Sequence, residues 1–199
     1  TLQDSSAASD VYKRQTPEVM RGYFGIGVEG ISKQSNFGAV ARTAHAFGAN
    51  FIFTVSEAID LNRVNSVDTS SAYKNTPFYS FDSPENLLLP KECKLVGVEI
   101  TEDAIELPSF HHPRCAAYIL GPERGILSDP VLDRCDYTVK IPMKFSINVG
   151  LAGALIMYDR LLSMGRFSPR PHRPGGPTTS LPTPVFGAPA WVRKKAKKA

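Results

Sequence analysis

Polar residues that could bind a ligand follow a predicted strand in the middle of the chain. Cys115–Leu120 is a short apolar run that stops at Gly121-Pro122, which is how a buried parallel strand ends. Glu123 comes directly after this turn. Ligands of open α/β sheets collect beyond the carboxyl ends of the strands, so a binding site is expected around Glu123.

A second strand end of the same kind is expected at Tyr137–Ile141, where Pro142 prevents further pairing. Backbone that cannot complete a ladder leaves N–H and C=O groups free, and two such ends can bind a flat heterocycle such as adenine. Ser146 is predicted to cap the helix that runs through Met164. Asn148 would then lie in its first turn, near the positive end of the helix dipole.

A third candidate group lies on a predicted helix, Asn36–Phe47. Its apolar residues recur at helical spacing and form one buried face, and Arg42 lies off that face. Asn36 is expected to cap this helix, and Gly38 allows a backbone or a phosphate to approach closely. Taken alone, Arg42 has the pattern of an ordinary solvated side chain.

These groups must be positioned by strands and helices that alternate along the chain. Strands are predicted at Tyr23–Val28, Asn50–Val55, Lys94–Ile100, Cys115–Leu120 and Tyr137–Ile141, with a shorter one at Phe78–Phe81. Helices are predicted at Asn36–Phe47, Asp129–Arg134 and Ser146–Met164, with a helical turn or two around Pro84–Leu89. The alternation favours an α/β fold with a mostly parallel sheet and helices on both faces.

A dinucleotide-binding fingerprint is matched by letter at Gly25-x-Gly27-x-x-Gly30. The glycines lie within the predicted strand, however, and no helix begins at Gly30. Close backbone packing explains them better than a nicotinamide or flavin site.

Length and composition indicate one folded domain with tails. The 199 residues fit one domain of about 150 residues, predicted here at 17–165. Residues 1–16 are small, polar and without period, and are expected to be a disordered leader or a non-native remnant. The uncharged run Phe145–Tyr158 is too short to cross a bilayer.

Cysteines and histidines do not show the spacing of a metal site. Cys93, Cys115 and Cys135 are odd in number and lack zinc or redox spacing, so they are expected to be buried free thiols in a reducing cytoplasm. His111-His112 is expected to be a solvated pair on a loop.

Basic residues gather at the C-terminal end. Of 23 Lys and Arg, nine follow Asp159, where there is no Asp or Glu, and the remaining 14 are outnumbered by 19 acidic residues. Seven prolines lie between Pro169 and Pro189. Residues 166–199 are therefore expected to be a flexible basic tail suited to phosphate contact, with Trp191 available for base stacking. RNA contact is also possible at Tyr73–Asn75, although a surface loop is the simpler interpretation.

Three segments in order, Asn36–Ala44, Leu120–Gly125 and Ile141–Asn148, resemble the motifs of SpoU-type, or TrmH-like, RNA ribose 2′-O-methyltransferases of the SPOUT superfamily. The resemblance covers roughly residues 22–164. It implies an α/β fold with a deep C-terminal trefoil knot, a rare exception to the rule against threading. It also implies a homodimer with active sites near the subunit interface.

The resemblance further implies S-adenosylmethionine as the methyl donor and tRNA or rRNA as the substrate. The donor would lie in the loops after the last two strands and contact Ile100, Thr101, Gly121, Ile141, Met143 and Ile147. The RNA would be bound by Arg42 and by the tail residues Arg193, Lys194 and Lys195. No metal is required, because the donor carries the reactive group.

Arg42 is the catalytic residue that the resemblance implies, within a polar network of Asn36, Glu123, Ser146 and Asn148. A ribose hydroxyl is a poor nucleophile, so it must be oriented and relieved of its proton. Arginine is almost always protonated in proteins, which favours a phosphate clamp over a general base, although the base remains an alternative.

Two departures from the family pattern lie in the expected donor loops. Gly125 follows Glu123 by two residues rather than three, with Ile126 at the usual glycine position. Only Lys144 and Phe145 separate Met143 from Ser146, fewer than in the commonest pattern. A noncatalytic RNA-binding protein on the same scaffold and a nucleotide-binding oxidoreductase are the two alternatives to the methyltransferase.

Overall fold

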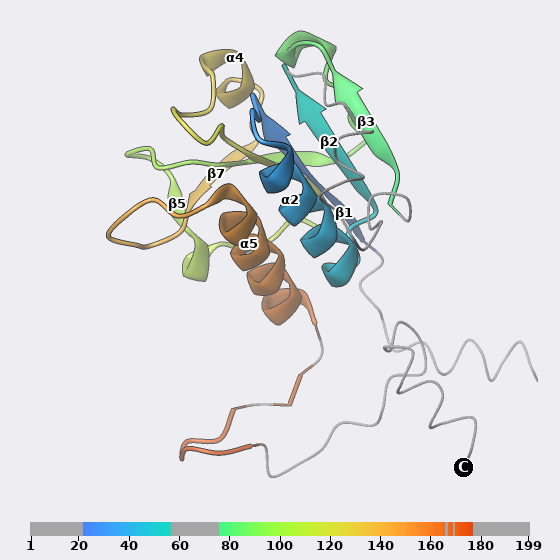
Figure 1. Cartoon of the computed structure of the whole chain (residues 1–199). Helices are drawn as coiled ribbons and strands as arrows, with labels where there is room; N and C mark the ends of the chain where they lie inside the picture. Colours follow the sequence, from blue (N-terminus) through green and yellow to red (C-terminus); the bar gives the residue numbers. More distant parts are fainter. Residues whose placement is uncertain (1–21, 57–75, 166, 169, 177–199) are drawn as a thin grey trace, which may run out of the picture. The chain divides into compact units, whose positions relative to one another are not determined.

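The computed structural model describes residues 22–56, 76–165, 167–168 and 170–176, and its centre is a parallel sheet (Figure 1). Over these residues the sheet has seven strands in the order β3-β2-β1-β6-β4-β7-β5, and every pair of neighbours is parallel. The strands are β1 (Tyr23–Glu29), β2 (Phe51–Val55), β3 (Phe78–Phe81), β4 (Lys94–Val98), β5 (Ile105–Glu106), β6 (Cys115–Leu120) and β7 (Tyr137–Lys140).

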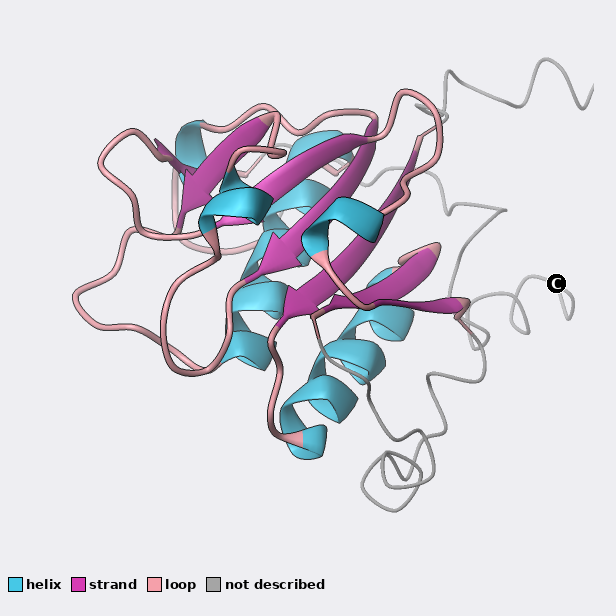
Figure 2. Ribbon diagram, turned by 90° about the horizontal axis from the view of Figure 1, so that it is seen from above, coloured by secondary structure: helices cyan, strands magenta, loops and turns pink. Residues whose placement is uncertain are grey.

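Helices cover both faces of the sheet, as predicted. The elements are α2 (Gln34–Phe47), α4 (Asp129–Leu132) and α5 (Val149–Met164), with the 3-10 turns η2 (Pro84–Asn86) and η3 (Leu107–Ser109). The long helices α2 and α5 pack side by side along the strands, whereas α4 contacts η2 (Figures 1 and 2).

Side chains that alternate along the strands build one apolar cluster on each face. In β6, Ala116, Tyr118 and Leu120 join the cluster beneath α2 and α5. Ala117 and Ile119 join the opposite cluster, which includes Leu87 after η2 and Val131 of α4. Strands buried on both faces explain why these segments read as continuous apolar runs in the sequence.

The glycines of the apparent dinucleotide fingerprint are packing residues. Gly25 and Gly27 lie within β1, and a Cβ at either position would overlap the ring of Phe51 or Phe53 on β2. Gly30 has a positive φ of 58° just after the strand. The prediction of close backbone packing is therefore confirmed.

All six predicted strands are present, with ends within two residues of those expected. The seventh, β5, was missed because two residues are too few to show a strand pattern. The helical turn or two expected around Pro84–Leu89 is a single 3-10 turn at Pro84–Asn86. The cysteines are free as expected, but they are half-buried rather than fully buried.

The chain divides into two compact units, Thr1–Met164 and Gly165–Ala199, and all the elements above belong to the first. The expected leader, Tyr73–Asn75 and the tail residues Trp191 and Arg193–Lys195 lie outside the described residues. The predicted domain boundaries stay predictions. Among the described helices, none combines the length and apolar character that a membrane crossing requires.

A buried polar network anchors α5 to the sheet. His112 is only 1% exposed, and its Nδ1 lies 2.6 Å from the Tyr118 hydroxyl while its Nε2 lies 3.0 Å from Asp159 Oδ2. Arg160 Nη1 donates to the same hydroxyl at 3.1 Å. The expectation that His112 is solvated is wrong, because it is buried and hydrogen-bonded to Tyr118 of β6 and Asp159 of α5.

The contacts of His112 fit the neutral ring. A proton on Nε2 can be donated to Asp159, which leaves Nδ1 to accept the Tyr118 hydroxyl proton. Burial lowers the pKa of His112, and the hydrogen bond to Asp159 opposes that effect without cancelling it. The folded protein therefore holds this histidine neutral at a pH where the unfolded chain already protonates it.

The free energy of unfolding should fall as the pH drops below about 6.5, the ordinary histidine pKa, because protons then bind preferentially to the unfolded chain. Urea denaturation at pH 7.5 and 5.5 measures this fall. In His112→Gln the free energy of unfolding should fall less between these two pH values, although this variant is less stable overall than the wild type. The matched variant His111→Gln, at the exposed neighbour, should keep the full fall. An equal fall in both variants would contradict the role of His112.

Candidate active site

A cavity of about 460 Å³ opens at the carboxyl ends of three neighbouring strands, β4, β6 and β7. Its walls are the segments that follow these strands and the beginnings of α2 and α5. Nine of the predicted site residues line it: Asn36, Ile100, Gly121, Glu123, Ile141, Met143, Ser146, Ile147 and Asn148. Thr101 and Arg42 are not among the lining residues.

The carboxylate of Glu123 connects two walls of this cavity. Its Oε2 accepts hydrogen bonds from the Ser32 backbone N–H at 3.1 Å and from the Ser32 hydroxyl at 3.0 Å. Its Oε1 accepts from the Lys33 N–H at 3.1 Å and from the Asn36 side-chain amide at 2.9 Å. Asn148 in turn donates to Asn36 Oδ1 at 3.0 Å. The predicted residues Asn36, Glu123 and Asn148 are therefore joined in one network.

These hydrogen bonds keep Glu123 ionised. Partial burial raises the pKa of Glu123, but the bonds from Ser32, Asn36 and Lys33 outweigh burial and lower the pKa to about 2. The stabilising contribution of this carboxylate is therefore present above its ordinary pKa and is lost only as the pH falls toward 2. A carboxylate with such a low pKa is a poor general base at neutral pH, so its role is to position other groups.

The N-terminal cap predicted for the first helix is wrong. Helix α2 begins at Gln34, with Lys33 at the cap position and no side-chain cap, so Asn36 lies inside the first turn. Its amide is used by Glu123 instead. The carboxylate of Glu123 takes over part of the capping, because it accepts the Lys33 N–H at the positive end of the helix dipole.

The cap predicted for the last helix is also wrong. Helix α5 begins at Val149, and Ser146 is an exposed residue of the preceding loop. Asn148 occupies the cap position, where its Oδ1 accepts the Gly150 N–H at 2.8 Å. Asn148 thus caps α5 with its oxygen and bonds Asn36 with its nitrogen.

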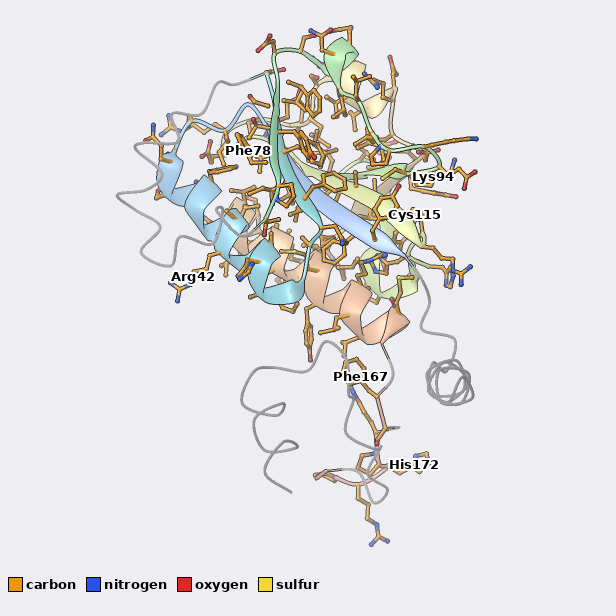
Figure 3. All side chains as sticks on the ribbon, turned by 90° about the vertical axis from the view of Figure 1, so that its right-hand side faces the viewer. Arg42, Phe78, Lys94, Cys115, Phe167 and His172 are labelled. Carbon is orange, nitrogen blue, oxygen red and sulfur yellow. The ribbon has the colours of Figure 1, made fainter. Side chains whose placement is uncertain are left out.

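Arg42 lies on the exposed side of α2, and Figure 3 shows its side chain extending away from the sheet. Within one chain the structure therefore does not bring Arg42 into the wall of the cavity. Thr101 lies beside the cavity: its hydroxyl donates to Asp103 at 2.7 Å, and its carbonyl accepts from Lys140 Nζ at 3.3 Å.

Glu99 is a wall residue that sequence reasoning missed. Its two oxygens accept the backbone N–H groups of Ile100 and Leu127, both at 2.8 Å, which ties the segment after β4 to the segment after β6. A Cβ at Gly121 would come within 3.0 Å of Glu99 Oε2, so only glycine fits there without a shift. The predicted strand ran to Ile100 and therefore included Glu99. The observed strand β4 ends at Val98, so Glu99 lies in the segment that follows it. Lys33 and Lys140 also line the cavity and were not predicted.

The model of the SpoU rRNA methylase family matches residues 24–158 of this chain. A 23S rRNA (guanosine-2′-O-)-methyltransferase of Nitrosomonas europaea is 28% identical over 140 residues, which are 66% of this chain and 53% of that protein. A protein of the same name from Coxiella burnetii is 27% identical over 168 residues, 79% of this chain and 64% of its own length. The chain thus spans between half and two thirds of these relatives.

Solved structures share the fold. The SpoU methyltransferase AviRb of Streptomyces viridochromogenes, in complex with AdoMet, superposes with a TM-score of 0.65 at 23% identity, over 71% of this chain and 60% of that one. The A. aeolicus TrmH/SpoU tRNA modifying enzyme gives a TM-score of 0.61 at 18% identity, over 79% and 84%. The predicted α/β architecture is confirmed, while the trefoil knot stays a prediction.

Removal of the Asn36 amide should raise the pKa of Glu123 by about one, because a hydrogen bond to the charged form is lost. The side-chain carboxyl carbon of Glu123, assigned by its loss in Glu123→Gln, can be followed by NMR from pH 6 to pH 2 in the wild type and in Asn36→Ala. The exposed Asn86 of η2 offers the control Asn86→Ala, which should leave this titration unchanged. A wild-type titration near pH 4.5 would show that the network does not form in solution.

Proposed function

Because the chain belongs to the SpoU rRNA methylase family, we propose that it transfers the methyl group of S-adenosylmethionine to a ribose 2′-hydroxyl of tRNA or rRNA. The observation that carries the proposal is the cavity at the ends of β4, β6 and β7, bordered by the network of Glu123, Asn36 and Asn148. The names of the relatives, which are 2′-O-methyltransferases of rRNA, support the reaction class.

The cavity suits an adenosine-containing donor. Its volume of about 460 Å³ lies within the usual range of small-molecule sites. Ile100, Met143 and Ile147 contribute partly exposed apolar side chains to the wall. Gly121 brings backbone to the surface of the cavity where a side chain would be crowded by Glu99. In this proposal Ile100, Gly121, Ile141, Met143 and Ile147 hold the donor, with Thr101 beside them. The donor, when bound, supplies an activated methyl group.

The polar network would fix the acceptor. Glu123 is ionised and has its oxygens turned to α2, so it holds the loop after β6 in place rather than removing a proton. Asn36 and Asn148 present side chains at the rim of the cavity, and Ser146 adds a hydroxyl in the neighbouring loop. Arg42 would clamp a phosphate of the RNA and orient the ribose hydroxyl toward the methyl group.

A second copy of the chain is part of the proposal, because Arg42 does not line the cavity of its own chain. Helix α5 begins at the cavity and carries exposed apolar side chains at Leu151, Leu155, Tyr158 and Leu161. Such an apolar stripe on the exposed side of a helix is suited to pairing across a two-fold axis.

The proposal also includes a location and a role for the basic tail. We place the enzyme in the cytoplasm, where free thiols such as Cys93, Cys115 and Cys135 are usual. We assign phosphate contact to Arg193, Lys194 and Lys195.

The reaction and the role of Arg42 are tested by transfer of labelled methyl from S-adenosylmethionine to total tRNA and to rRNA. The wild type should leave label in a nuclease-resistant 2′-O-methyl dinucleotide. Arg42→Ala should lose at least about 100-fold in rate, and Arg42→Lys should not restore it, because a bidentate clamp needs the guanidinium. The control Arg114→Ala, at an exposed arginine outside the cavity wall, should retain activity. Donor binding without transfer to either RNA would favour a noncatalytic RNA-binding protein.

The contribution of Arg42 from the second copy is tested with mixed dimers of Arg42→Ala and Glu123→Gln, each carrying its own affinity tag. Each variant alone should be inactive. The doubly purified heterodimer should regain about half of the wild-type activity, because one of its two sites then has both residues intact. Light scattering checks that the sample is dimeric. An inactive heterodimer would place Arg42 in the site of its own chain, and a monomeric wild type would remove the dimer from the proposal.

A further inference from the structure

Phe145 has the most exposed large apolar side chain in the described part of the chain, at 83%. It belongs to the segment between β7 and α5, which arches out from the body of the fold (Figure 1). Met143 lies before it and Ser146 and Ile147 lie after it, and all three line the cavity. Phe145 therefore belongs to a loop whose residues on either side of it line the cavity, and the proposed function assigns it no role.

Packing within the chain does not account for this phenylalanine. Phe145 belongs to neither of the two apolar clusters of the sheet, and the described aromatic pairs do not include it. An aromatic ring held in water is unfavourable by the hydrophobic effect, so a partner that covers its face would be bound with a gain in free energy.

The cations of the loops that border the cavity indicate the kind of partner. Lys144 is the sequence neighbour of Phe145, Lys33 lines the cavity at the start of α2, and Arg124 lies in the loop after β6 between the lining residues Glu123 and Gly125; all three are exposed. The carboxylates of Glu99 and Glu123 in the same cavity accept backbone N–H groups of the protein. An exposed aromatic ring beside a cavity bordered by cations fits a chain that carries both phosphates and aromatic bases.

We propose that Phe145 is a stacking platform for the base of the target nucleotide, with Lys144 and Arg124 contacting the adjacent phosphates. The inference rests on the proposed function and narrows its substrate class. A base can lie on Phe145 only if it is not stacked in a duplex, so the substrate is an unpaired nucleotide in a loop or single strand. Stacking by itself tolerates any base, which leaves sequence preference to other contacts.

Kinetics with the modified RNA separate a platform from a structural role. Phe145→Ala should raise KM for RNA about tenfold, with kcat and the affinity for S-adenosylmethionine nearly unchanged, because one base stack is lost. Phe145→Trp should keep a KM close to that of the wild type. Leu88, 79% exposed and outside the cavity wall, provides the control Leu88→Ala, which should behave as the wild type. An unchanged KM in Phe145→Ala, or a weakened donor affinity instead, would overturn the proposal.

A second measurement does not depend on methyl transfer. In the double variant Phe145→Trp, Trp191→Phe, the introduced indole is the sole tryptophan, because the chain has one. Its fluorescence should be quenched in a saturable way by single-stranded oligoadenylate and far less by a blunt RNA duplex of the same length. Equal quenching by both, or by neither, would overturn the platform. Emission already typical of a buried indole before RNA is added would show that a second copy covers this position instead, which also overturns it.

The two measurements keep the proposals distinguishable. If the single strand quenches the fluorescence but the wild type transfers no methyl group, the stacking role of Phe145 is supported and the proposed methyltransferase activity is rejected. If the wild type transfers methyl groups and Phe145→Ala has an unchanged KM for RNA, the methyltransferase activity is supported and the stacking role of Phe145 is rejected.

Discussion

The hydrogen-bonded carboxylate of Glu123 is the interaction on which the geometry of the site depends. It joins the loop after β6 to the first turn of α2, two segments about 90 residues apart in the chain. Asn36 extends the connection to Asn148 at the start of α5. The anion accepts the N–H groups of Ser32 and Lys33, just before α2, where the helix dipole is positive. The same contact therefore stabilises a helix and sets the position of a loop.

The second long helix is fixed at both ends, which explains how the loops before it and beside it can form a defined cavity. Asn148 caps its start and bonds α2, while Asp159 and Arg160 bind His112 and Tyr118 near its other end. Arg160 also donates to the carbonyl groups of Pro113 and Arg114. Because α2 and α5 pack together on one face of the sheet, a shift of either would open the contacts at the cavity.

The sequence predicted the strands well and the contacts between distant residues poorly. Strands buried on both faces leave continuous apolar runs, and a turn at Gly121-Pro122 marks the end of β6, so Glu123 could be located before the structure was known. The motif resemblance is confirmed by the family match. The caps assigned to Asn36 and Ser146 were wrong because capping rules consider only local partners, whereas Glu123 competes for Asn36 from another part of the chain. His112 was misjudged for the same reason, since Asp159 is 47 residues away.

For the proposed methyl transfer, the groups that line the cavity favour a positioning role over proton transfer. Glu123 has a pKa of about 2 and both oxygens occupied. The oxygens of Glu99 hold two backbone N–H groups, and Lys140 donates to the carbonyl of Thr101. Each of these ionisable groups is already bound to the protein, which suits a rigid frame more than a base that must gain and lose a proton. Such a frame is sufficient where the transferred group is already activated by the donor, because the main task left to the protein is to bring a hydroxyl and a methyl group into line.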